Sequence, residues 1–151
     1  MSKRSILLIF GAIALLVGCA FVVTQQVATN KPKQEITAEA KSFDIRKSEM
    51  TSLQETALGG DCKAAFRLGK YHFFVTLQYD EAAKWLRLAA KCPNVQYKGW
   101  FVAALLTQKR SPKVTAEIDS VIEDMKKIDP EDENTKSAVA EVQRRKSAGQ
   151  L

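Results

Sequence analysis

The fold is decided by residues 60–91, which read GDCKAAFRLGKYHFFVTLQYDEAAKWLRLAAK. Alanines and larger apolar residues recur there every three or four positions, first over residues 64–71 and then over residues 82–90. This spacing predicts two helices that each have one apolar face. Residues 76–79 form a turn between them, and helices joined by so short a turn pack side by side in opposite directions. Asp61 and Asp80 precede the two helices and are expected to cap their free N–H groups.

The residues on either side of this stretch extend the helical pattern. Upstream, Met50, Leu53 and Ala57 have helical spacing, and Gly59-Gly60 ends that helix. Downstream, we expect a third helix over residues 95–108 and, after the start signal Ser111-Pro112, a fourth helix. The inward stripe of the fourth helix comprises Val114, Ile118, Val121, Ile122, Met125 and Ile128.

A last helix follows the acidic start signal at residues 129–133, and it ends in Arg144-Arg145-Lys146. Its apolar side is small, so it either packs as a cap on the domain or serves as a binding element. No alternating run of useful length for a strand occurs. The sequence therefore predicts an all-α domain over residues 36–151.

The central stretch resembles a known repeat family. It resembles the Sel1-like repeat, a relative of the tetratricopeptide repeat, in residues Gly60-Asp61, Ala64, Leu68-Gly69, Tyr71, Asp80, Ala83, Trp85 and Ala89-Ala90. The resemblance covers one repeat, with a half repeat before it and a degenerate one over residues 97–127. It implies a short array of antiparallel helix pairs whose concave face holds a protein partner, as in most adaptors of that family.

The N-terminus has the pattern of an export signal. Lys3 and Arg4 precede an apolar run over residues 6–23 that contains no charge. Within that run, Leu16-Val17-Gly18-Cys19 resembles the lipobox of bacterial lipoproteins. That resemblance implies a signal peptide at residues 1–18 and a lipid, such as palmitate, on Cys19. The alternative is an uncleaved membrane anchor over residues 5–24.

Both interpretations place the domain on the periplasmic side of the cell envelope, joined to the membrane by a flexible polar tether at residues 19–35. The lipoprotein family sorts its members to the outer membrane where no Asp follows the lipidated cysteine. An outer-membrane lipoprotein is therefore favoured, and an inner-membrane anchor is the alternative.

The chain has three cysteines. If Cys19 carries a lipid, Cys62 and Cys92 remain, and an oxidising periplasm allows them to form a disulfide. Cys62 opens the first helix of the repeat and Cys92 closes the second, so in an antiparallel pair they lie at neighbouring ends. The alternative is two unpaired small core residues. Since the chain has one histidine, His72, and no Cys-x-x-Cys spacing, no metal site and no cofactor are expected.

Charge and composition argue against two classes of function. The net charge of +6 is not gathered into a stripe, which argues against nucleic-acid binding. His72 has no Ser-His-Asp or Cys-His set to serve, and the paired carboxylates coincide with helix starts, so no enzyme is expected. The cations Arg67, Lys70, Lys84 and Arg87 fall on polar helix faces and are expected to be solvated, or else to meet an acidic partner.

Aromatic residues near the turns and on the third helix are the best candidates for a partner contact, because aromatic side chains are enriched at interface hot spots. They are Phe73, Phe74, Tyr79, Tyr97 and Trp100. We therefore expect a membrane-tethered periplasmic adaptor that binds a protein partner in an envelope assembly of the secretion, pilus or conjugation type. The alternative is a structural envelope lipoprotein, or an immunity or exclusion factor, with no catalytic role.

Overall fold

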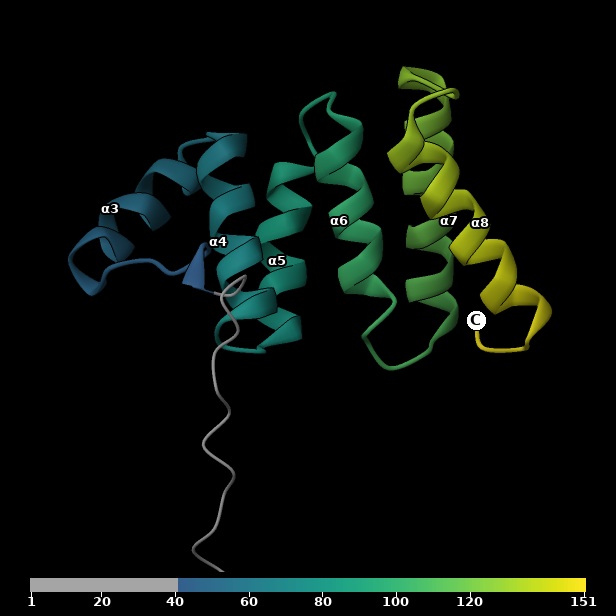
Figure 1. Ribbon diagram of the computed structural model, residues 1–151, viewed down its shortest axis with the longest axis horizontal. Helices are drawn as coiled ribbons and strands as arrows, with labels where there is room; N and C mark the ends of the chain where they lie inside the picture. Colours follow the sequence, from purple (N-terminus) through teal and green to yellow (C-terminus); the bar gives the residue numbers. More distant parts are fainter. Residues whose placement is uncertain (1–40) are drawn as a thin grey trace, which may run out of the picture. The chain divides into compact units, whose positions relative to one another are not determined.

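A computed structural model describes residues 41–151 of the chain (Figure 1). Within this range the chain forms helices and no strands, which confirms the predicted all-α class. The helices are α3 (Lys47–Leu58), α4 (Cys62–Phe74), α5 (Tyr79–Ala89), α6 (Val95–Leu105), α7 (Pro112–Ile128) and α8 (Glu133–Ser147). No helix within residues 41–151 is long and apolar enough to cross a membrane. The described residues do not include Cys19, the tether, or the apolar segment that is predicted to be either a signal peptide or a membrane anchor.

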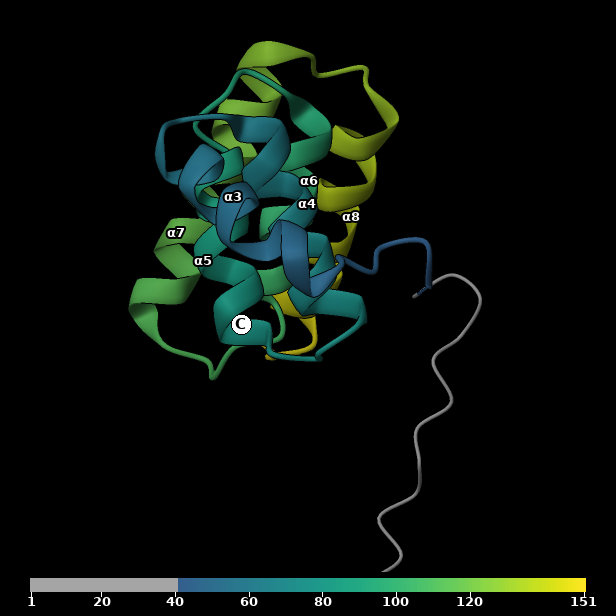
Figure 2. The same ribbon diagram turned by 90° about the vertical axis from the view of Figure 1, so that its left-hand side faces the viewer.

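Successive helices pack against one another, as two views of the ribbon show (Figure 1 and Figure 2). α3 lies on α4, α4 on α5, α5 on α6 and α6 on α7. α8 contacts both α6 and α7. The last helix is therefore packed onto the domain, and its buried Val142 belongs to the core.

The helices enclose two neighbouring apolar clusters. One is formed by α3, α4 and α5 and includes Leu68 and Trp85. The other is formed by α5, α6, α7 and α8 and includes Leu86, Phe101 and Met125. The predicted stripe of α7 supplies much of the second cluster, but its last member, Ile128, is 40% exposed. Ile128 is the last residue of α7 and lies next to the exposed Asp129. The apolar spacing of α7 therefore continues past the part of the helix that packs against the core.

Short-range capping signals account for most helix starts. The Asp61 carboxylate accepts a hydrogen bond from the Ala64 N–H at 2.7 Å. Ser111 caps α7, with Pro112 in its first turn. The prediction that Asp80 caps α5 is wrong, because α5 begins at Tyr79 and Gln78 precedes it without a side-chain cap.

The turn before α5 explains the position of Asp80. The turn before α5 is tight, since the Gln78 N–H bonds back to the His72 carbonyl at 2.9 Å. Asp80 consequently falls in the first turn of the helix. There its carboxylate accepts a hydrogen bond from the Gln108 amide, 28 residues away in sequence, at 3.3 Å.

α4 and α5 approach each other most closely at Gly69. A Cβ atom added to Gly69 would lie 2.5 Å from Leu86 Cγ and 3.3 Å from the Leu86 backbone nitrogen. Both residues are buried, and Leu86 is fully so. Glycine is therefore the residue that this contact between the two helices requires.

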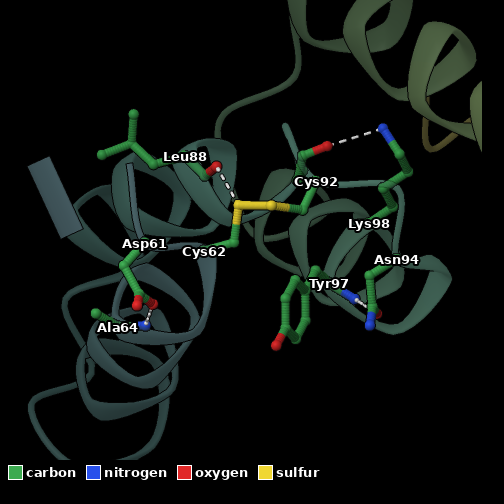
Figure 3. The surroundings of a disulfide bond; sticks show 9 residues. Asp61, Cys62, Ala64, Leu88, Cys92, Asn94, Tyr97 and Lys98 are labelled. Carbon is green, nitrogen blue, oxygen red and sulfur yellow. Dashed lines mark hydrogen bonds between the residues drawn. A yellow bond between two sulfur atoms is a disulfide. The ribbon is translucent and has the colours of Figure 1, made fainter. Parts of the chain in front are cut away.

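A disulfide joins the open ends of the same two helices (Figure 3). It links Cys62, the first residue of α4, to Cys92, which follows the end of α5, with 6.3 Å between the Cα atoms. The structure thus confirms this pairing and the antiparallel direction of the pair. Figure 3 also shows Asn94, which caps α6 by accepting a hydrogen bond from the Tyr97 N–H at 3.1 Å.

The close contact at Gly69 predicts opposite effects for two alanine substitutions. Gly69→Ala should lower the free energy of unfolding by about 1–3 kcal/mol, because overpacking against Leu86 outweighs the gain in helix propensity. Gly99→Ala is the matched control, since the nearest atoms to an added Cβ lie at ordinary contact distances of 3.6 and 3.7 Å. It should leave stability unchanged or raise it by up to about 1 kcal/mol. Urea unfolding of both variants tests this, and equal effects would contradict it.

The disulfide predicts a redox-dependent stability. Its two cysteines are 30 residues apart, and closing a loop of that size contributes about 3–4 kcal/mol. Reduction should therefore lower the urea midpoint of the wild-type chain markedly. A Cys62→Ala, Cys92→Ala variant should unfold at the reduced midpoint with or without reductant. An unchanged wild-type midpoint on reduction would show that the crosslink contributes little.

Candidate functional site

The aromatic residues at the ends of α4 and α5 meet those of α6. The Phe73 ring contacts the rings of Phe74, Tyr79 and Trp100, with centroids 5.1, 5.3 and 5.7 Å away. Phe74 also contacts Trp100 at 5.2 Å. All four contacts are edge-to-face, the arrangement that aromatic quadrupoles favour. The structure thus brings four of the five candidate aromatic residues into one cluster.

The fifth candidate, Tyr97, extends the cluster by one helical turn. Its ring stacks on Phe66 of α4 at a centroid distance of 4.5 Å. Phe66 was not among the predicted candidates, although positions 66, 70, 73 and 74 share one face of a helix. Tyr97 and Trp100 lie three positions apart on α6 and so also share one helix face. The two matching spacings are the signal that could have identified Phe66.

Lys70 lies at the centre of these rings. Its Nζ is 3.8 Å from the ring centroid of Phe43, 5.1 Å from that of Trp100 and 5.5 Å from that of Phe66. A fourth ring, Phe74, lies at 6.0 Å. Lys70 is half-buried, so the expectation of a solvated side chain is wrong: aromatic rings from α4, from α6 and from the segment before α3 gather around the ammonium group.

We refer to this group as the Lys70 surface; it comprises Phe43, Phe66, Lys70, Phe73, Phe74, Tyr79, Tyr97 and Trp100. Its rings are half-buried, except Tyr79, which is 39% exposed. Phe66, Phe73 and Trp100 pack against the core formed by α5–α8, and Tyr97 packs against the other core. Within the described residues, Phe43 and Phe74 pack against neither core. They form an outer layer on rings that the cores hold in place.

An apolar groove of about 280 Å³ adjoins the Lys70 surface between α6 and α8. Trp100 belongs to both features and links them. The groove is lined by Gly99, Trp100, Val102 and Ala103 of α6, by Leu106 just after it, and by Asn134, Ser137, Ala138 and Glu141 of α8. The Lys70 surface and the groove together include residues of α4, α6 and α8, with Tyr79 from the start of α5 and Phe43 from the segment before α3.

A charged network borders the groove. Hydrogen bonds from Arg144 and Arg145 lower the pKa of Glu141 to about 2, so its carboxylate stays ionised at neutral pH. Arg145 also donates to the Leu106 carbonyl at 3.1 Å, which ties α8 to the end of α6. The groove therefore has a fixed polar border beside its apolar walls.

Histidine and acidic groups make no obvious reaction centre in the described part of the chain. Burial lowers the pKa of His72, and its Nδ1 lies 3.2 Å from the Thr76 hydroxyl in the turn after α4. Within residues 41–151, no group of three or more His, Cys, Asp and Glu side chains is arranged to hold a metal ion. The Lys70 surface, with its groove, is the arrangement that points to a function.

No family model, no curated protein and no solved structure matches this chain. The resemblance to Sel1-like repeats therefore rests on the motif residues themselves. Of these, Gly69 faces Leu86 in the tight contact between α4 and α5, Trp85 is buried, and Tyr71 is half-buried against the core of α3–α5.

Proposed function

We propose that the chain is a membrane-tethered periplasmic adaptor that binds a protein partner in an envelope assembly through the Lys70 surface. The observation that carries this proposal is the gathering of all five candidate aromatic residues on one half-buried surface beside an apolar groove. Aromatic residues are enriched at protein interfaces, and Trp and Tyr are enriched among the hot spots that dominate the binding free energy. A polar border such as that of Glu141 and its arginines is typical of interface rims.

The order of the helices supports a short Sel1-like array. In this interpretation α4 and α5 are one repeat and α6 and α7 are the degenerate second repeat, while α8 covers its end. The Lys70 surface then joins the first helices of the two repeats, and the groove continues it onto α8. By the resemblance, such arrays hold their partners on a concave face.

The disulfide supports a location outside the cytoplasm. Disulfides persist in oxidising compartments and are rare where thiols are kept reduced. Together with Lys3, Arg4 and the uncharged apolar run at residues 6–23, this favours an exported domain. We propose that a lipid on Cys19 holds the domain at the outer membrane, in an assembly of the secretion, pilus or conjugation type.

Binding through the Lys70 surface predicts a selective loss of the partner in a Phe74→Ala variant. Phe74 packs against neither core, so the fold should persist, while truncation of an interface aromatic lowers affinity by about thirtyfold or more. Leu58→Ala is the control, because Leu58 is 68% exposed at the end of α3 and is not part of the Lys70 surface. The measurement is crosslinking of the full-length chain in intact cells, followed by quantitative mass spectrometry.

One envelope protein should crosslink to the wild-type chain and to Leu58→Ala but not to Phe74→Ala. If the same proteins crosslink to all three, the Lys70 surface is not the interface. The structural-lipoprotein alternative would then hold, and in it the loss of Cys19 would impair the cell while Phe74→Ala would be silent.

The lipid on Cys19 predicts the intact mass of the chain extracted from membranes. That mass should begin at Cys19 and include acyl chains, and a Cys19→Ser variant should lack the acyl addition. A wild-type mass that retains residues 1–18 would identify the segment as an uncleaved anchor instead.

A further inference from the structure

Phe43 differs from the other rings of the Lys70 surface in its place in the chain. It lies in a turn before α3, and the residues from Asp44 to Arg46 are not helical. Its ring stacks on Phe74 with a centroid distance of 5.0 Å and an interplanar angle of 23°. The Lys70 ammonium group lies 3.8 Å from the same ring.

The remainder of the Lys70 surface is built without Phe43. Phe66, Lys70 and Phe74 come from α4, and Trp100 comes from α6, which packs on α5. The segment is anchored by Ile45, which is 4% exposed in the core of α3–α5, whereas Phe43 itself contacts neither core. Phe43 is thus an aromatic side chain from a non-helical segment that is docked on a surface formed by other elements.

We infer that the Lys70 surface is a binding site for an aromatic side chain carried on an extended segment, and that Phe43 occupies this site in the unbound chain. The inference rests on the proposed function and names the chemistry of the partner: a segment whose Phe, Tyr or Trp side chain replaces Phe43. An aromatic ring can both stack on Phe74 and interact with the Lys70 ammonium group. An aliphatic side chain loses both interactions.

Occupation by Phe43 also sets the affinity for the partner. A group joined to its site by a short stretch of chain has an effective concentration in the millimolar range. The partner's apparent affinity equals its intrinsic affinity multiplied by the fraction of molecules in which Phe43 leaves the site free. Displacing Phe43 would also release the chain just before Ile45, at the end of the domain that continues into the proposed tether.

The test adds a peptide in trans to the full-length chain. The probe is a blocked synthetic peptide of residues 41–45, Lys-Ser-Phe-Asp-Ile, and its control is the same peptide with Phe43→Leu. Binding is followed by the fluorescence of Trp100 in a Trp85→Phe background, because the chain has two tryptophans. The protein variants are Phe43→Ala, Phe43→Leu and the parent chain.

The Phe peptide should change the Trp100 fluorescence saturably in both Phe43 variants, with an affinity about tenfold higher than in the parent chain. The Leu peptide should bind those variants at least about fivefold more weakly. The inference would be overturned if the Phe peptide bound the parent chain as tightly as it binds the Phe43 variants. It would also be overturned if the Phe and Leu peptides bound those variants equally well, or if no saturable binding occurred. Loss of the helical circular dichroism signal in both Phe43 variants would overturn it as well, since Phe43 would then be part of the fold.

The two proposals can fail separately. If a partner crosslinks in cells only when Phe74 is present, but the peptide does not bind, then the inferred site for an aromatic side chain is wrong. The adaptor function would still be supported. Peptide binding with no partner dependent on Phe74 would support the aromatic site and contradict the adaptor function.

Discussion

The close contact between α4 and α5 is the constraint on which the rest of the domain depends. Because Gly69 has no side chain, the two helices approach so closely that Leu86 fills the space a Cβ atom on Gly69 would need. The Cys62–Cys92 disulfide joins the open ends of the same helices. This pair turns the face of α4 that carries Phe66, Lys70 and Phe74 toward α6. The Lys70 surface is therefore a consequence of how one helix pair packs.

The disulfide that joins the helix pair contributes more free energy than the contacts among the rings of the Lys70 surface. A disulfide that closes a loop of this size contributes about 3–4 kcal/mol, whereas an aromatic pair contributes about 0.5–1.5 kcal/mol beyond the area it buries. The inner rings Phe66, Phe73 and Trp100 also pack against a core, but Phe43 and Phe74 do not. Contacts in the outer layer can consequently change while the helix pair stays intact.

The local parts of the structure were predictable from the sequence, and the long-range parts were not. Helical spacing identified the helices, and Asp61 and Ser111 cap as expected because both signals act within one turn. The Asp80 cap was predicted wrongly because α5 begins one residue earlier, at Tyr79, after a turn closed by the Gln78–His72 hydrogen bond. Lys70 resembled a solvated cation because Phe43 and Trp100, which surround it, come from other elements. The candidate aromatic residues were identified one at a time, but their common centre at Lys70 required the fold.

The most direct test of this account is whether the rings gather around Lys70 in solution. Ring currents shift nearby protons upfield, so a spectrum of the oxidised full-length chain with isotope-labelled lysine should contain one side-chain ε-methylene signal well apart from the others. A Lys70→Arg variant would assign that signal, and Phe43→Ala should move it toward the position of the other lysines. A spectrum in which all lysine ε-methylene signals overlap would contradict the existence of the Lys70 surface and remove the basis for the proposed interface.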